Sequence, residues 1–227
     1  MKKDSKVLFE EIMDSLFSDV EKEKTLAEYK KNHYKGISEE WGIYVVKNSK
    51  NKEIKLLDSP EIVTKKSIYW EDNFGKKVNA VNNLYLYIGK TNCKKGIKDR
   101  LSKYIRFGYG TTKIHEGGYL LWFVKNNKDL YANFATLAEI EKKQPDLYEK
   151  AKEIFETSVT NEEKTSNQPV TLAEIIEIGL ISLHNIAYYY PPLANANKKS
   201  LYIKMNTDTF SYRIYIEWKK YWENVLN

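Results

Sequence analysis

Residues 84–90, Leu-Tyr-Leu-Tyr-Ile-Gly-Lys, are the stretch of sequence that decides the fold. The stretch is rich in aliphatic and aromatic residues and ends at a glycine and a lysine, which is typical of a buried β-strand. A second run, Trp41–Val46, contains Gly42-Ile43-Tyr44 and has the same character. Residues 119–124 are a third run of this kind, so we expect three strands.

Helices are expected on either side of these strands in the sequence. Apolar residues recur at helical spacing in several segments. These expected helices cover residues 5–32 (with a second start near Thr25), 97–105, 135–156 (interrupted near Pro145), 171–186 and 211–226. The sequence therefore predicts an α+β chain with a small, mainly antiparallel sheet flanked by helices. Residues 107–118 and 157–168 are expected to be loops, the second of them mobile, and residues 201–205 a further strand.

The tetrapeptide Thr-Leu-Ala-Glu occurs three times, at residues 25–28, 136–139 and 171–174. In a capping box the threonine accepts a hydrogen bond from the third helical amide, and the glutamate reaches back to the cap. We expect three helix starts here, with Glu174 as a capping residue.

Composition and charge limit the kinds of protein that this chain can be. A single cysteine, Cys93, excludes an internal disulfide and a cysteine-rich zinc site. No run of about 18 apolar residues is present, so no transmembrane helix is expected. The first residues have no apolar signal core, so we expect a cytoplasmic protein. The net charge of +6 permits a polyanionic partner.

Several residues that suit phosphodiester hydrolysis follow the strands in order. Arg100 and Tyr104 are four residues apart, so they share one face of the expected helix. Basic side chains would neutralise the phosphate, a carboxylate would hold magnesium through oxygen ligands, and a tyrosine with a lowered pKa could take a proton from water. The candidate catalytic residues are Tyr44, Tyr87, Lys90, Arg100, Tyr104, Glu177 and Asn195.

This ordered set resembles the GIY-YIG nuclease domain, and it is most similar to the form at the N-terminus of the bacterial nucleotide-excision-repair incision subunit. The matching motifs after the two tyrosine motifs are residues 97–104 (Ile-Lys-Asp-Arg-Leu-Ser-Lys-Tyr), residues 177–183 (Glu-Ile-Gly-Leu-Ile-Ser-Leu), and Pro192 to Asn195. The resemblance implies a three-stranded, mainly antiparallel sheet flanked by helices. It covers about a third of the chain.

The resemblance also implies roles for single residues. Tyr44 and Tyr87 would line the active site, with one of them acting as general base. Lys90 would lower a tyrosine pKa or contact the phosphate, and Arg100 would stabilise the developing charge. Tyr104 would stand where other members have histidine or tyrosine.

Two residues complete the implied site. Glu177 would be the sole protein carboxylate on a Mg²⁺ or Mn²⁺ ion. It stands among apolar residues, where a carboxylate needs a partner, water or metal. Asn195 would orient the site, and its distance from Pro192 favours it over Asn197.

Departures from the family pattern define the expected domain organisation. Tyr44 and Tyr87 are 43 residues apart, whereas the family joins them through a short hairpin. We therefore expect insertions at 48–82 and 126–167 in a nuclease core of residues 39–200. Residues 1–38 would form an N-terminal helical extension, and residues 201–227 an aromatic-rich C-terminal extension.

Residues 90–106 are strongly basic and coincide with the expected site, which favours contact with phosphates. The candidate nucleic-acid-binding residues are Lys94, Lys95, Lys98, Lys103, Arg106 and His115. Tyrosines 188–190 and the aromatic residues of 211–226 could stack on bases, although packing is the commoner reason for such clusters. His184 could approach the site or be structural.

The expected function is a metal-dependent DNA endonuclease, of the type II restriction or phage-defence kind. The size of the chain resembles GIY-YIG type II restriction endonucleases. One site cuts one strand, so double-strand cleavage favours a homodimer. The alternatives are a structure-specific repair or recombination nuclease and a catalytically silent nucleic-acid-binding module.

Overall fold

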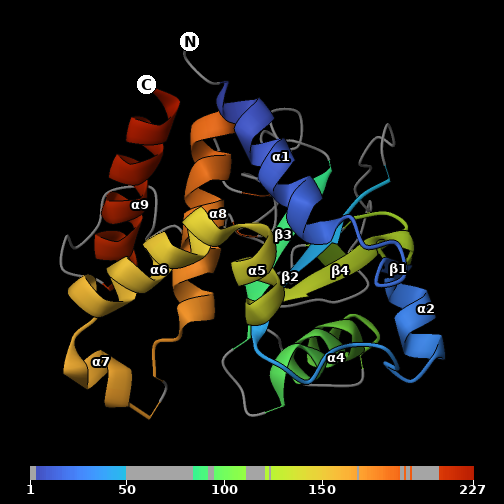
Figure 1. Cartoon of the computed structure of the whole chain (residues 1–227). Helices are drawn as coiled ribbons and strands as arrows, with labels where there is room; N and C mark the ends of the chain where they lie inside the picture. The colour runs from blue at the N-terminus through green and yellow to red at the C-terminus, as the bar shows by residue number, and fades with distance from the viewer. Residues whose placement is uncertain are drawn as a thin grey trace, which may run out of the picture.

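Four strands in the described part of the chain form one antiparallel sheet in the computed structural model, in the order β1-β4-β2-β3 (Figure 1). The strands are β1 (Lys24–Thr25), β2 (Gly42–Lys47), β3 (Tyr85–Lys90) and β4 (Tyr131–Thr136). The structure describes residues 4–49, 84–91, 95–110, 121–122, 124–167, 169–189, 192, 195 and 210–227.

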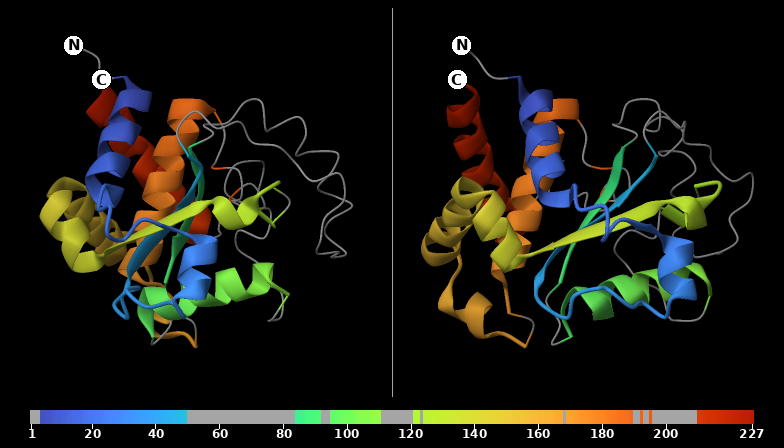
Figure 2. Two further views of the ribbon diagram at one scale, coloured as in Figure 1. Left: turned by 90° about the vertical axis from the view of Figure 1, so that its right-hand side faces the viewer. Right: turned by 45° about the vertical axis from the view of Figure 1, so that its right-hand side comes forward.

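Helices cover both faces of this sheet (Figure 2). The helices are α1 (Ser5–Phe17), α2 (Leu26–Lys31), α4 (Gly96–Gly108), α5 (Leu137–Lys143), α6 (Pro145–Ser158), α7 (Asn161–Thr165), α8 (Leu172–Tyr188) and α9 (Phe210–Leu226), with a 3-10 turn η3 (Asn127–Asp129). The α+β class with an antiparallel sheet is therefore confirmed.

Alternation along β2 produces two separate cores. Ile43 and Val45 pack into the larger core, which contains residues of α1, α5, α6, α8 and α9. Tyr44 and Val46 pack into the smaller core, which contains residues of α2 and α4. Because successive side chains of a strand point to opposite faces, the two tyrosines of the motifs end up on the α4 face.

The strands β2 and β3 are direct neighbours although a long segment separates them in the sequence. Tyr44 pairs with Gly89 and Val46 pairs with Tyr87 in an antiparallel register. On its other side β2 pairs with β4, where a Cβ atom at Gly42 would lie 2.1 Å from the Ala135 carbonyl oxygen. Only glycine fits at this position, which explains the first residue of the Gly-Ile-Tyr motif.

The third strand is not where the sequence predicted it. Leu121 and Trp122 lie in a 3-10 turn and Val124 forms an isolated bridge, whereas β4 lies within the segment 126–167 that was expected to be an insertion. Asn133 in the middle of β4 disfavours a strand by propensity. Tertiary contacts override this, because the Asn133 amide donates to the carbonyl oxygens of Phe17 (2.9 Å) and Asp19 (3.0 Å).

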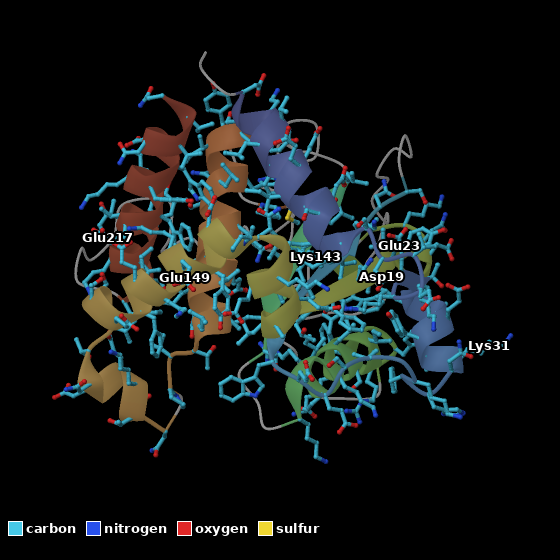
Figure 3. The ribbon with its side chains drawn as sticks, in the orientation of Figure 1. Asp19, Glu23, Lys31, Lys143, Glu149 and Glu217 are labelled. Carbon is cyan, nitrogen blue, oxygen red and sulfur yellow. The ribbon has the colours of Figure 1, made fainter. Side chains whose placement is uncertain are left out.

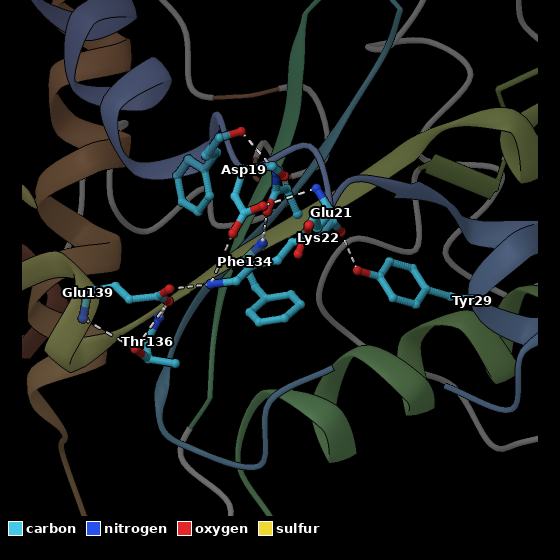
Figure 4. A network of polar contacts seen from close by, with 9 residues as sticks. Asp19, Glu21, Lys22, Tyr29, Phe134, Thr136 and Glu139 are labelled. Carbon is cyan, nitrogen blue, oxygen red and sulfur yellow. Dashed lines mark hydrogen bonds and ion pairs between the residues drawn. The ribbon is translucent and has the colours of Figure 1, made fainter. Parts of the chain in front are cut away.

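The N-terminal segment belongs to the packed body of the protein. Asn133 ties β4 to the end of α1, and an ion pair joins Lys22 to Glu139 (Figure 4). The Tyr29 hydroxyl donates to the Lys22 carbonyl oxygen, which fixes α2 to the same loop. The strand β1 then adds a fourth strand beside β4, which the sequence did not predict.

Three helices start at the predicted threonine caps, but the capping box of α8 is incomplete. Complete capping boxes begin α2 at Thr25 and α5 at Thr136. A third begins α7 at Thr160, inside the segment 157–168 that was expected to be a loop, and Arg213 donates to the capping Glu163 at 2.7 Å. Residues 160–163, Thr-Asn-Glu-Glu, have the sequence pattern of a capping box, so this helix start could have been predicted.

The C-terminal aromatic residues pack onto α8. Trp218 donates from Nε1 to the Ile175 carbonyl oxygen (2.9 Å), and Trp222 donates to that of Gly179 (3.1 Å). Both indoles are buried, and a Cβ atom at Gly179 would lie 2.5 Å from the Trp218 ring. Packing, rather than stacking on bases, is therefore what these two tryptophans do.

Some expectations fall outside the described residues. These are the structure of 50–83 within the first insertion, most of the loop at 107–118 and the strand at 201–205. Within the described ranges, no helix combines the length and the apolar character that a membrane span requires.

Candidate functional site

Three tyrosines form a group of contacting rings between the sheet and α4. The ring centroids of Tyr44 and Tyr87 are 5.8 Å apart, and Tyr104 of α4 stacks on Tyr87 at 5.9 Å. All three side chains are buried. Tyr104 reaches the group because Ile97, Leu101 and Tyr104 lie on the face of α4 that packs against the sheet.

Gly89 makes room for this group. A Cβ atom at Gly89 would lie 2.5 Å from Cζ and 2.8 Å from the hydroxyl oxygen of Tyr44, and 2.8 Å from the Tyr87 ring. The Tyr44 ring therefore lies across the backbone of its paired residue on β3. The glycine of the second tyrosine motif is required by the position of the tyrosine of the first.

Arg100 and Glu177 act on both tyrosines of the motifs. Burial raises the pKa of Tyr44 to about 12, and the Arg100 charge beside it opposes the rise. Burial also raises the pKa of Tyr87 well above its ordinary value, and the nearby Tyr44 and Glu177 raise it further. The structure thus brings residues from β2, β3, α4 and α8 together. It also corrects the sequence prediction that a tyrosine pKa is lowered, because burial outweighs Arg100.

The Tyr44 hydroxyl is buried inside this cluster. It forms no hydrogen bond of normal geometry with any described residue. Arg100 and Tyr87 are nevertheless close enough to lower its pKa. A buried hydroxyl without a proper partner costs free energy, so its retention is more typical of a functional group than of a structural one.

These raised pKa values predict an alkaline transition. The folded-state pKa of Tyr44, about 12, exceeds its ordinary value of 10.0, so its neutral form stabilises the fold below pH 10 and this contribution is lost as the pH rises toward 12. Tyr29, Tyr85 and Tyr87 shift in the same direction.

We expect the melting temperature to fall steadily as the pH rises from 10 to 12. The tyrosinate absorbance should appear together with the loss of the helical circular dichroism signal. Tyrosines that all titrate near pH 10 in a protein that is still folded would contradict this burial.

Asn195 holds the outer edge of β3. The Ile88 N–H donates to Asn195 Oδ1 at 2.9 Å, and Asn195 Nδ2 donates to the Ile88 carbonyl oxygen at 2.8 Å. The asparagine is fully buried, and a turn fixes it through its own N–H, which donates to the Pro192 carbonyl oxygen at 2.8 Å. Asn195 thus forms the two hydrogen bonds that a neighbouring strand would otherwise form with Ile88, the residue between Tyr87 and Gly89.

Lys90 is not among the charges that shift the pKa of Tyr44 or Tyr87, so of its two predicted roles contact with the phosphate stays a prediction. Its ammonium group forms an ion pair with Glu174, and both side chains are only partly exposed. Thr171 still caps α8 through the Glu174 N–H, but the Glu174 side chain does not complete a capping box. The prediction that Glu174 is a capping residue is therefore wrong, because the Lys90 ammonium attracts its carboxylate instead. The contact of Glu174 with Lys90 is a feature that the sequence reasoning missed.

Some basic residues of α4 and its N-cap form ion pairs, and others are exposed to solvent. Lys98 pairs with Glu39 and Lys103 with Asp99, each at 2.7 Å. Lys95 is exposed and Arg106 is partly exposed. Lys94 and His115 lie outside the described residues.

His184 lies about two turns of α8 beyond Glu177, where it packs against α1. Its ring is fully buried and packs edge-on against Phe9 of α1, with ring centroids 5.0 Å apart. It also contacts Tyr188, at 4.8 Å. Of the two roles expected for His184, these contacts favour the structural one.

The residues present fit a magnesium ion better than a softer metal. Among the residues that the structure describes, no group of three or more histidine, cysteine, aspartate or glutamate side chains is arranged to hold a metal ion. Magnesium is usually held by one or two carboxylates together with waters and phosphate oxygens. A buried carboxylate, Glu177, beside two tyrosine hydroxyls is an all-oxygen set of this kind.

Comparisons of the chain with protein-family models, with curated proteins and with solved structures found no match. The chemistry of this site is therefore inferred from its own residues and their positions.

Proposed function

We propose that the chain is a GIY-YIG nuclease that hydrolyses phosphodiester bonds of DNA with the help of a divalent metal ion. The observation that carries the proposal is the convergence of Tyr44, Tyr87, Arg100 and Glu177, which come from four elements far apart in the sequence. A purely structural tyrosine cluster does not require a partly buried arginine and a buried carboxylate beside it.

In this proposal each residue has a distinct task. Arg100 stabilises the negative charge that develops on the phosphate. Tyr44 orients the attacking water and accepts its proton as the tyrosinate, a form that the Arg100 charge favours against the larger opposing effect of burial. Tyr87 holds the Tyr44 ring in place through a ring contact, and Tyr104 in turn stacks on Tyr87.

Glu177 is the residue that would hold a Mg²⁺ or Mn²⁺ ion. Such an ion supplies positive charge at the phosphate and lowers the pKa of bound water. Glu174 is three residues away on the same face of α8, and its ion pair with Lys90 keeps a second carboxylate and a cation at this end of the sheet. Asn195 is a positioning residue that acts through the backbone of β3.

We further propose that the enzyme acts as a homodimer on a specific sequence, as a restriction or phage-defence enzyme does. A single site cuts one strand, so a two-fold pair of sites would cut both strands of a symmetric sequence. A structure-specific repair nuclease is the second candidate, because the same centre would serve it equally well.

The test is to incubate the purified protein with plasmid, nicked and branched DNA in Mg²⁺, with EDTA as the control, and to sequence the ends of the products. We expect Mg²⁺-dependent cleavage at one recurring sequence. Cuts only at branch points would replace restriction by structure-specific cleavage. DNA binding without cleavage in Mg²⁺ or Mn²⁺ would contradict the nuclease and identify a binding module.

A further inference from the structure

An open basic pocket lies at the C-terminal end of α2, away from the tyrosine group. Its volume is about 340 Å³, and it is lined by Lys24, Lys31, Asn32, His33, Lys35 and Gly36. Its lining thus contains lysine, histidine and amide side chains but no carboxylate. Figure 3 shows Lys31 projecting outward from the end of α2.

The lysines of this pocket differ in their pairing from those of α4. Lys98 and Lys103 of α4 form ion pairs, whereas none joins Lys24, Lys31 or Lys35 to a carboxylate among the residues that the structure describes. Glu28 is the nearby acid; it is engaged in the capping box of α2 with Thr25, and the Lys24 and Lys31 charges also lower its pKa. Because the three lysines outnumber this carboxylate, the pocket keeps a net positive charge, and positive charge in a concave surface attracts anions.

The backbone around the pocket adopts a conformation that side chains disfavour. His33 and Tyr34 are consecutive non-glycine residues with positive φ, at 52° and 60°. The turn is fixed because the Tyr34 N–H donates to the Tyr29 carbonyl oxygen at 2.8 Å and the Lys35 N–H to that of Asn32 at 3.1 Å. Strained residues of this kind concentrate at ligand sites, and this turn places His33 and Lys35 in the pocket lining.

The helix α4 connects this pocket to the candidate active site. Lys30 of α2 lies over the Tyr109 ring, with Nζ 3.4 Å from the ring centroid, just beyond the end of α4. The charge of Arg106, near that end, lowers the pKa of Tyr34, although burial raises this pKa overall. Arg100 lies earlier on the helix, and the rise from Arg100 to Gly108 is about 12 Å. Basic side chains thus extend from the tyrosine group to the pocket.

We propose that the pocket binds a backbone phosphate of the same DNA that the tyrosine centre cleaves, on the side of the cut toward which α4 runs. This inference rests on the proposed function. The pocket lies on the order of 15–20 Å from Arg100, which corresponds to roughly five base-pair steps at about 3.4 Å each. The N-terminal segment therefore extends the DNA-binding surface beyond the nuclease core.

The test compares a double variant, Lys31→Ala with Lys35→Ala, with a control, Lys142→Ala with Lys143→Ala. The control lysines are exposed, lie in the last turn of α5, and that helix packs on the other face of the sheet. Binding to a fluorescent duplex is measured in EDTA over a range of salt concentrations, so the result does not depend on cleavage.

We expect the pocket variant to bind about tenfold more weakly, while the control stays within about twofold of wild type. The dependence of log affinity on log salt concentration should become shallower in the pocket variant, by the amount that corresponds to the loss of about two phosphate contacts. The defect should disappear on duplexes that end fewer than about five base pairs from the cut. A variant with Lys31→Arg and Lys35→Arg should restore binding, which excludes a folding defect.

Unchanged binding of the pocket variant, or an equal loss in the control, would overturn this inference. Because affinity is measured without metal, a wild-type protein that binds through the pocket but cuts no DNA in Mg²⁺ would refute the nuclease and leave the pocket standing. A wild-type protein that cuts DNA while the pocket variant binds normally would refute the pocket and leave the nuclease standing.

Discussion

Replacing Glu177 with glutamine is expected to lower the rate of Mg²⁺-dependent DNA cleavage by about a thousandfold or more. Glutamine keeps the shape of the side chain but removes the negative charge that would hold the cation. The charge of Glu177 raises the pKa values of both Tyr44 and Tyr87, so this carboxylate is near enough to both tyrosines to hold a cation beside them. The rate is measured at saturating enzyme in a single turnover.

Two matched variants make this result specific. Glu153→Gln removes an exposed carboxylate whose partner is Lys150 on the same helix, and should leave cleavage unchanged. Glu174→Gln breaks the ion pair with Lys90 and should lower the rate less than Glu177→Gln does. Loss of cleavage only in Glu174→Gln would move the metal site to Glu174. The melting temperature of each variant shows whether it is folded.

Tyr44→Phe is expected to lower the cleavage rate by between about a hundredfold and ten-thousandfold, the range for losing a general base. The Arg100 charge lowers the pKa of both motif tyrosines, but only for Tyr44 is it the largest influence after burial. For Tyr87, the neighbouring Tyr44 and Glu177 raise the pKa further. Tyr44 therefore ionises more easily at the moment of proton transfer.

This variant should separate function from stability. The Tyr44 hydroxyl has no hydrogen bond of normal geometry to lose, so Tyr44→Phe should change the free energy of unfolding by less than about 1 kcal/mol. The wild-type rate should rise with pH from about 7 to about 9.5, and the residual rate of the variant should be independent of pH. A pH profile that survives in Tyr44→Phe but not in Tyr87→Phe would assign the base to Tyr87.

The local sequence carries enough information for most of the helices and two of the strands. The apolar spacing of α8 and the capping boxes of α2 and α5 are short-range signals, and they predict the helix starts at Thr25 and Thr136 correctly. Strands β2 and β3 were predicted because their residues are buried on both faces and therefore almost continuously apolar.

The strand β4 could not be read locally because its stability comes from distant residues. The run Tyr-Ala-Asn-Phe-Ala-Thr has weak strand propensity, and Asn133 is compatible with it only through the carbonyl groups at the end of α1. The contact between Lys90 and Glu174 was hidden for the same reason. A capping interaction is local and visible in the sequence, whereas an ion pair between β3 and α8 is not.

For the site, the order of the residues predicted which of them would meet. The positions of Tyr44 and Tyr87 on one face follow from the alternation of strand residues, and that of Tyr104 follows from its helical spacing to Arg100. The direction of the tyrosine pKa shift did not follow, because it depends on how completely the three rings exclude water.

The measurement that tests the account most directly is the cleavage of one supercoiled plasmid preparation by wild type and by Glu177→Gln, at saturating protein, in Mg²⁺ and in EDTA. The account predicts that wild type cuts the plasmid in Mg²⁺ only and that Glu177→Gln leaves it intact over the same time. Equal cleavage by the two proteins, or an uncut plasmid with folded wild type in both Mg²⁺ and Mn²⁺, would contradict it.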